Sequence, residues 1–329
     1  MTQQQQSTQA AALAAGTNYF RANSSGADAS ATGAGAIAVG TSAVASSGDA
    51  IAIGVQALAD GSHNSLAIGT VAHAAAEYTV AVGRDASATG VRSTGLGAVA
   101  AAAGLESTAA GSVATASAKY ATAAGARAAA TADGASAFGR GANATAAYSL
   151  ALGLGSIASA TDAIAIGTKT SASGTSSIAV GIAVATGPYA VAIGDQSYAS
   201  EPQTVALGSS ASATAVFACA LGAQADAMSP GSVAVGSAAQ GNALYGTALG
   251  THAHANTSYG VALGYGSICD RAEAVSVGQP GVRTRQIVNV AAGTQGTDAV
   301  NLDQVNAMFA QVKEQLAALD KRLALPQVS

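Results

Sequence analysis

Side chains able to do acid–base, nucleophilic or metal chemistry are few in this sequence and form no recognisable catalytic set. Charged residues make up 9% of the 329-residue chain, with 4 histidines and 2 cysteines. The sequence has no zinc-protease, phosphate-binding-loop, serine-hydrolase or paired Cys-x-x-Cys motif. His252 and His254 flank Ala253 and share one side of an expected strand, but no carboxylate or cysteine stands beside them. We interpret them as surface residues, and we expect no enzyme activity, no metal site and no cofactor.

The two cysteines, Cys219 and Cys269, occupy different positions in the repeat described below and lie several turns apart. That separation exceeds the Cα distance of roughly 7 Å that a disulfide tolerates. We therefore expect both to be small, buried, apolar residues.

The tyrosines are more informative, because six of the nine share one position, five residues before a repeated glycine, which Phe217 also occupies. The six are Tyr78, Tyr120, Tyr148, Tyr189, Tyr245 and Tyr259. They lie along one edge of any repetitive fold. They either cover a turn or a neighbouring subunit, or form an exposed aromatic edge that contacts a ligand, since Tyr is enriched in binding hot spots.

A repeat of 14 residues positions these side chains. A glycine closes each copy's first apolar run, and the spacing departs from 14 only between Gly54 and Gly69 (15) and between Gly181 and Gly194 (13). The series is Gly40, Gly54, Gly69, Gly83, Gly97, Gly111, Gly125, Gly139, Gly153, Gly167, Gly181, Gly194, Gly208, Gly222, Gly236, Gly250, Gly264 and Gly278. Large and small residues alternate before each glycine and again after it, which is typical of strands.

Fourteen residues suffice for two short strands and two turns, which make one coil of a β-solenoid. Half of the residues are hydrophobic, yet aromatic residues come to 4% and Trp is absent. Such a chain can build only a thin core, with alanines packed between two close backbone layers. Seventeen intervals of about 4.8 Å predict a rod on the order of 80 Å long.

The Val, Ile and Leu side chains of the first strand then face outwards as an apolar ladder. The simplest cover is the same ladder from identical chains, so we predict a homo-oligomer whose chain number the pattern leaves open. Its predicted interface includes Ile51, Ile53, Leu66, Ile68, Val80, Val82, Ile164, Ile166, Val233 and Val235.

The middle of the ladder departs from this pattern. Its two ladder positions carry Thr94 and Leu96, Thr108 and Ala110, Thr122 and Ala124, and Ser136 and Phe138. If the ladder lines an oligomer axis, small and hydroxyl side chains leave room and polar partners for water. We predict a locally wet stretch there; the alternative is that these side chains face away from the axis.

The pattern changes after Gly278, where residues 279–297 break the repeat. From Asp298 we expect a helix, with Thr297 or Asp298 as its N-cap, ended by Pro326. Its apolar residues follow an uninterrupted heptad pattern, which predicts a coiled coil. They are Leu302, Val305, Phe309, Val312, Leu316, Leu319 and Leu323. The expected divisions are a flexible segment 1–18, a head 19–278, a neck 279–297, a stalk 298–325 and a tail 326–329.

The repeated unit, best seen in Asn64-Ser65-Leu66-Ala67-Ile68-Gly69, resembles the head repeat of YadA-like trimeric autotransporter adhesins. Residues 285–305, which begin RQIVNVAAG, resemble the neck of that family, and residues 18–24 resemble its lead-in to the head. The resemblance covers nearly all of the chain past residue 18. It implies a left-handed parallel β-roll, a homotrimer around one axis, and a neck that leads into a three-stranded coiled coil.

The same resemblance implies an adhesin and virulence factor of the bacterial outer membrane that binds collagen, fibronectin, laminin or a host-cell receptor. A net charge of −4 without a basic patch argues against nucleic acid. We recognise neither a secretion signal nor a four-strand membrane anchor in the sequence. We therefore expect either an excised passenger fragment, held at the membrane through an anchor outside this chain, or a structural or receptor-binding segment of a phage or prophage tail fibre.

Overall fold

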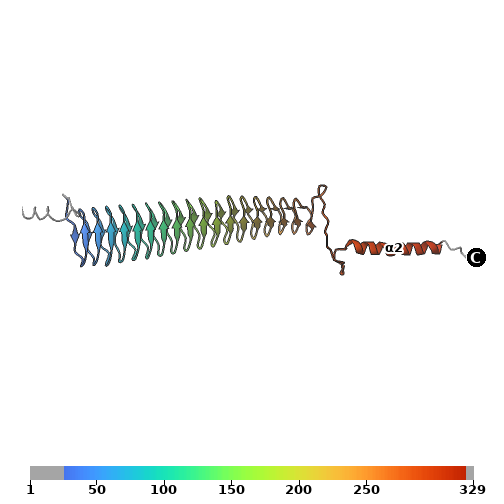
Figure 1. The fold of residues 1–329 in the computed structure, drawn as a ribbon, viewed down its shortest axis with the longest axis horizontal. Coiled ribbons are helices and arrows are strands. Elements are labelled where there is room, and N and C mark those ends of the chain that lie inside the picture. The colour runs from blue at the N-terminus through green and yellow to red at the C-terminus, as the bar shows by residue number, and fades with distance from the viewer. Residues whose placement is uncertain (1–25, 324–329) are drawn as a thin grey trace, which may run out of the picture. The chain divides into compact units, whose positions relative to one another are not determined.

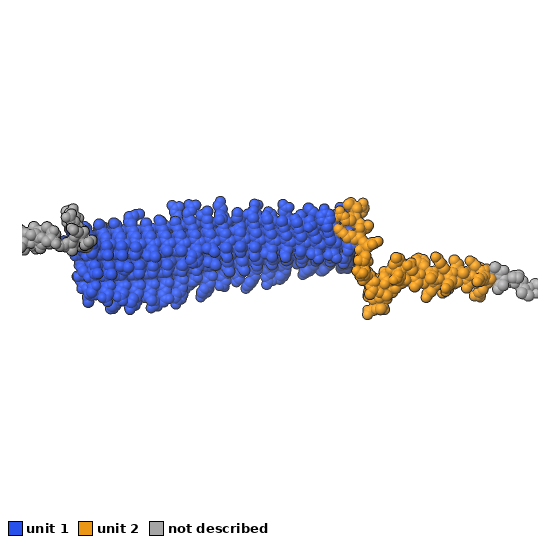
Figure 2. All heavy atoms as spheres, viewed as in Figure 1, with its two compact units in different colours: residues 1–279 blue, residues 280–329 orange. Residues whose placement is uncertain are grey.

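The computed structural model describes residues 26–323. The chain divides into two compact units, the first ending at Gln279 and the second beginning at Pro280 (Figure 2). The expected segment 1–18, the lead-in 18–24, the end of the helix at Pro326 and the tail lie outside the described residues.

The first unit is a parallel β-solenoid, a stack of coils with two short strands each (Figure 1). The first strands of the coils are β2 (Ile37–Val39), β4 (Ile51–Ile53), β6 (Leu66–Ile68), β8 (Val80–Val82), β10 (Thr94–Leu96), β12 (Thr108–Ala110), β14 (Thr122–Ala124), β16 (Ser136–Phe138), β18 (Leu150–Leu152), β20 (Ile164–Ile166), β22 (Ile178–Val180), β24 (Val191–Ile193), β26 (Val205–Leu207), β28 (Cys219–Leu221), β30 (Val233–Val235), β32 (Thr247–Leu249), β34 (Val261–Leu263) and β36 (Val275–Ser276). The second strands are β1 (Ser30–Ala31), β3 (Val44–Ala45), β5 (Leu58–Ala59), β7 (His73–Ala74), β9 (Ser87–Ala88), β11 (Ala101–Ala102), β13 (Thr115–Ala116), β15 (Ala129–Ala130), β17 (Asn143–Ala144), β19 (Ile157–Ala158), β21 (Ser171–Ala172), β23 (Val184–Ala185), β25 (Tyr198–Ala199), β27 (Ser212–Ala213), β29 (Asp226–Ala227), β31 (Gln240–Gly241), β33 (His254–Ala255) and β35 (Ile268–Cys269).

The strands pair with their counterparts in neighbouring coils, always in parallel, and the register follows the repeat. Ile51 therefore pairs with Leu66 across the 15-residue interval, and Ile178 pairs with Val191 across the 13-residue interval. The pairing of Ser171 with Val184 places the missing residue in the turn after Gly181. Turns absorb both irregularities, so every strand keeps its inward and outward faces.

The core consists almost entirely of alanine. Each coil between the two terminal ones buries two small residues from each strand segment, such as Ala50, Ala52, Ala57 and Ala59. Threonine is the largest residue whose side chain is fully buried. The predicted thin Ala core is confirmed, because the two backbone layers lie too close for anything larger.

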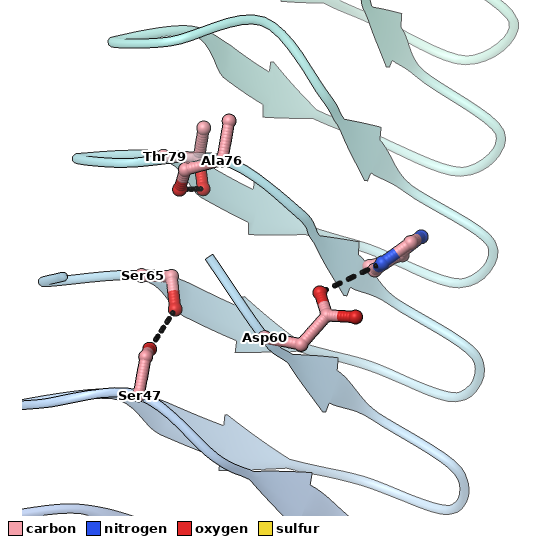
Figure 3. A network of polar contacts seen from close by, with 6 residues as sticks. Ser47, Asp60, Ser65, Ala76 and Thr79 are labelled. Carbon is pink, nitrogen blue, oxygen red and sulfur yellow. Dashed lines mark hydrogen bonds and ion pairs between the residues drawn. The ribbon is translucent and has the colours of Figure 1, made fainter. Parts of the chain in front are cut away.

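Hydroxyl groups replace some of these alanines, and several bond to nearby backbone or to each other, whereas those of Ser93, Ser107 and Ser177 have no hydrogen-bond partner in the described part of the chain. Thr79 donates from Oγ1 to the carbonyl oxygen of Ala76 at 2.7 Å, and the hydroxyls of Ser47 and Ser65 lie 3.2 Å apart (Figure 3). Ser149 donates to Ala146 in the same way as Thr79. These short bonds satisfy groups that burial would otherwise leave unpaired.

The repeated glycine closes the first strand in a conformation that side chains rarely adopt. Gly111 has φ +139°, and a Cβ added there would lie 2.6 Å from the carbonyl carbon and oxygen of Gly125 in the next coil. Stacked coils therefore approach each other too closely at this position for a side chain, and only glycine fits.

The second unit contains one described helix, α2 (Leu302–Leu323). The expectation of a helix from Asp298 with an N-cap at Thr297 or Asp298 is wrong. Asn301 caps the helix instead, since its Oδ1 accepts the amide of Gln304 at 3.0 Å. Asp298 caps an earlier turn, where its Oδ2 accepts the amides of Thr294 and Gln295 at 2.9 and 3.0 Å.

Candidate binding surfaces

Two turns join the strands of each coil, and they lie at opposite edges of the solenoid. The first turn follows the repeated glycine, and the second turn leads into the next coil. The second turn holds one residue per coil in the left-handed backbone region, five positions before the glycine. Tyrosine occupies this position in six coils, at Tyr78, Tyr120, Tyr148, Tyr189, Tyr245 and Tyr259, which we call the tyrosine column. Their φ angles lie between +53° at Tyr245 and +60° at Tyr120.

All six tyrosines of the column are exposed in the single chain, from Tyr78, half exposed, to Tyr148 at 68%. The Tyr245 and Tyr259 rings stack with centroids 5.4 Å apart. Lys119 places its Nζ 4.8 Å from the centroid of the Tyr120 ring. Phe217 is also exposed, so the second-turn edge presents aromatic faces along much of the head.

The backbone makes this display possible. The amide of Tyr259 donates to the carbonyl of Leu244 in the preceding coil at 2.9 Å, and Tyr245 bonds to Pro230 in the same way. Because the turn is held by its backbone, the side chain at this position is free to vary; Asp49, Arg92 and Ser176 occupy it in other coils.

The apolar ladder faces outwards from the first strands, as predicted. Ile164 and Ile166 flank the buried Ala165 and remain half-buried in the single chain, and Ile53 is exposed. None of the ten predicted ladder residues is fully buried. Their role in a subunit interface remains a prediction, since the structure contains a single chain.

The middle of the ladder shares this outward face. Thr94, Thr108 and Thr122 pair in register and are half-buried, as is Ala124. Phe138 is exposed at the end of this stretch. The wet zone therefore stays a prediction about an assembled head.

The heptad residues of α2 also lack a cover within the described chain, because the helix has no buried residue. Phe309, Val312, Leu316 and Leu319 are each about half exposed or more. An amphipathic helix with an open apolar seam is typical of a coiled coil separated from its partners.

The ionic contacts near the turns are local pairs. Arg84 pairs with its neighbour Asp85, and Arg92 donates from Nε to Glu106 in the next coil at 3.0 Å. His73 lies 3.0 Å from the carboxylate of Asp60, whose side chain is seen in Figure 3.

The expectation that His252 and His254 share one side of a strand is wrong. His252 lies in the first turn at φ +56°, whereas His254 lies in β33, so the two do not share one strand. His252 instead meets the Tyr265 ring edge-on at 6.2 Å. Within residues 26–323 no group of three His, Cys, Asp or Glu side chains could hold a metal ion.

Both cysteines are free, but only Cys269 is fully buried. Cys219 stands at a ladder position on β28, in register with Val205 and Val233, and is half-buried. Partial burial raises the pKa of its thiol. The prediction of a buried residue fails there because the outward side of the first strand is half covered at best.

The sequence interpretation missed a recess of about 480 Å³ on the first-turn edge. It is lined by Ala126, Arg127, Arg140, Gly141 and Leu154. The available signal was two successive coils, at Gly141 and Gly155, in which glycine takes the turn position that elsewhere carries a side chain.

These features define a class: a stiff solenoid that presents side chains along its edges, followed by a heptad helix. Eight segments match the YadA head domain repeat, at residues 31–57, 45–72, 61–86, 130–156, 158–182, 185–211, 199–225 and 242–267. Residues 286–322 match the coiled stalk of trimeric autotransporter adhesin. The head matches cover more than half of the chain, which therefore belongs to the YadA family of trimeric autotransporter adhesins.

The collagen-binding domain of the Yersinia adhesin YadA, solved by crystallography, is similar at 32% identity. The similarity covers 51% of this chain and 87% of that domain, with a TM-score of 0.43. Among curated proteins, none matches the chain. No helix in the described range is long and apolar enough to cross a lipid bilayer.

Proposed function

We propose that this chain is the head, neck and first part of the stalk of a homotrimeric, cell-surface adhesin that attaches bacteria to host extracellular matrix or cells. The observation that carries the proposal is the run of YadA head repeats through a solenoid whose apolar ladder is uncovered. A ladder of Val, Ile and Leu along a rod needs a partner surface, and a second and third copy supply an identical one.

The heptad seam of α2 supports the same assembly, because Leu302, Val305, Phe309, Val312, Leu316, Leu319 and Leu323 lie on a helix that buries nothing by itself. Light scattering of the purified chain, with and without residues 298–329, tests this step. A trimer in both forms supports the ladder as an interface in its own right. A monomer with the helix present contradicts the proposal.

The ligand-binding surface in this proposal is the tyrosine column. Its rings are exposed and repeat along the rod, so weak contacts add up through repetition and through three copies. Collagen is the ligand to test first, because the similar Yersinia domain is described as collagen-binding; fibronectin, laminin and host cells follow.

The experiment compares binding of the full chain and of Tyr245→Ser/Tyr259→Ser to immobilised matrix proteins. We expect the double variant to lose most of its binding, because the two rings are both exposed and stack on each other, so one ligand can contact both. Tyr198→Ser is the matched control, since Tyr198 is exposed on β25 away from the second turn. Unchanged binding by the double variant, with its trimer intact, would remove the column from the proposal.

A further inference from the structure

The recess on the first-turn edge exists because two neighbouring coils lack a side chain at the tip of the turn. Two residues after the repeated glycine, most coils carry a side chain in the left-handed region, such as Gln56, Val113 or Gln224. Gly141 and Gly155 take this position in successive coils, with φ +67° and +61°.

The fold does not require glycine at either site. A Cβ added at Gly141 or Gly155 would meet no atom within 4 Å, and other residue types adopt the same backbone conformation in the other coils. This contrasts with the repeated glycines, whose Cβ atoms would overlap the next coil. The two glycines therefore shape the surface, although the stacking of the coils does not require them.

The recess is positively charged. Arg127 and Arg140 come from adjacent coils and are exposed, and neither has an ion-pair partner within residues 26–323. Lys169 occupies the same turn position two coils beyond Gly141, also exposed and without a partner in that range. The first-turn residues from Ala98 to Ile182 include no acidic side chain.

Two other turn arginines of the described head are paired, whereas Arg271, in the turn before Gly278, also has no ion-pair partner within residues 26–323. Arg84 is paired with Asp85, and Arg92 is paired with Glu106. Two neighbouring guanidinium groups without a counter-charge repel each other, and an anion that binds both relieves this repulsion. Arg127 and Arg140, both without an ion pair, come together in the glycine-shaped recess, which points to a ligand there.

We propose that this recess binds a linear anionic polysaccharide, through carboxylate or sulfate groups on successive sugars. Arg127 and Arg140 donate forked hydrogen bonds to the anionic groups, while Leu154 and Ala126 offer apolar contact to a sugar face. Coils rise about 4.8 Å each, so the cations repeat along the rod and suit a chain whose charges also repeat. A volume of about 480 Å³ exceeds the needs of a single ion.

This site goes beyond the proposed function, because it lies at the opposite edge from the tyrosine column and its geometry is complete within a single chain.

The experiment titrates the full chain with a heparin hexasaccharide, a hyaluronate hexasaccharide, sodium sulfate and a poly-aspartate peptide, using calorimetry at low salt. The two sugars distinguish sulfate from carboxylate groups. We expect at least one of them to bind, with affinity falling as salt rises.

Two double variants test the assignment. Arg127→Gln/Arg140→Gln removes the charge, and Gly141→Gln/Gly155→Gln fills the recess with a residue that the fold tolerates at this position in Gln56 and Gln224. We expect each to weaken binding at least tenfold. Arg84→Gln/Arg92→Gln is the matched control, since it removes two positive charges from paired sites; we expect less than a twofold change.

Circular dichroism verifies that each variant remains folded. Absence of sugar binding to the unmodified chain, or binding by the glycine variant as tight as that of the unmodified chain, overturns the proposal. So does tighter binding of poly-aspartate than of either sugar, which would identify a protein partner, or equal competition by sodium sulfate, which would identify a site for a single anion.

Discussion

The head and the C-terminal unit cover their apolar side chains in opposite ways. Each coil of the head buries its alanines between its own two strands, so the core lies within one chain, in two buried clusters that run from Ala43 to Ala88 and from Ala100 to Cys269. Helix α2 has an apolar residue at every a and d position of its heptads and buries none of them. The head coil is therefore complete within one chain, whereas an isolated helix of this length is marginal in water.

The comparison also separates the two faces of each head strand. The inward face tolerates only Ala, Ser, Thr, Gly or Cys, because the layers are close. The outward face carries Val, Ile, Thr, Cys or Phe in different coils. The outward face therefore resembles the helix seam, since the described chain leaves the side chains of both at least partly exposed, and the fold leaves their identity free.

The largest loss of stability is expected in the head, at the repeated glycine, and it tests whether the head depends on close stacking of its coils. Gly111→Ala places a Cβ 2.6 Å from the backbone of Gly125 and demands φ +139° from a residue with a side chain. We expect a loss of several kcal/mol, since backbone strain of this kind costs about 1–3 kcal/mol before the clash is counted. Urea unfolding followed by circular dichroism measures it.

Gly155→Ala is the matched control, with φ +61° and nothing within 4 Å of the added Cβ. We expect it to change stability by less than about 1 kcal/mol, as at any permissive left-handed turn. If the two variants unfold at the same urea concentration, close stacking at the repeated glycine is not what limits the head.

The next effect concerns the helix seam. Leu316→Ser/Leu319→Ser removes two heptad residues, and we expect about 2–5 kcal/mol of stalk stability to be lost for each leucine that assembly buries. The helical signal at 222 nm should then melt at lower temperature while the β-sheet signal of the head is unchanged. Lys313→Ser, on the same helix outside the heptad positions, serves as control; a comparable loss there would argue against a coiled coil.

Much of the fold could be predicted because the repeat fixes it. A large–small alternation in phase with a 14-residue glycine places alanine inside and valine or isoleucine outside, as Ile51, Ala52 and Ile53 show. The 15- and 13-residue intervals indicate which coils have a turn that gains or loses one residue.

The features that could not be predicted depend on local hydrogen bonds and on the shape of the surface where neighbouring coils meet. An Asp shortly before a heptad pattern predicts a helix N-cap, so Asp298 was assigned that role. Its carboxylate instead accepts hydrogen bonds from the amides of Thr294 and Gln295, which precede it in the chain. The recess was missed because glycine is frequent throughout the chain, although Gly141 and Gly155 fall two residues after a repeated glycine, where most other coils carry a side chain. Cys219 was misjudged because it stands on the outward side of β28, which the chain covers only in part.

A smaller effect is expected at the true N-cap. Asn301 accepts the amide of Gln304 and donates from Nδ2 to the carbonyl of Val290 at 3.2 Å, and Gln304 donates from Nε2 to the carbonyl of Gly293. Asn301→Ala should cost about 1 kcal/mol of helix stability. Asn301→Asp keeps the cap acceptor but cannot donate to Val290.

Thermal melting at 222 nm measures both variants. If the cap bond dominates, Asn301→Asp should melt close to the unmodified chain and Asn301→Ala below it. Equal losses from the two substitutions would assign the effect to the link with Val290 and not to the cap.

The smallest effect is a pH dependence in the turn before the helix. The backbone amide of Thr294 chiefly, with that of Gln295, stabilises the ionised carboxylate and lowers the pKa of Asp298 below its ordinary value of 3.8. A lowered folded-state pKa adds stability that is fully present above the ordinary value and is lost as pH falls through the folded value. The amide proton shifts of Thr294 and Gln295 should therefore titrate with a midpoint below 3.8. Asp298→Asn should abolish that titration, and a midpoint at or above the ordinary value would show that these two bonds do not hold the turn.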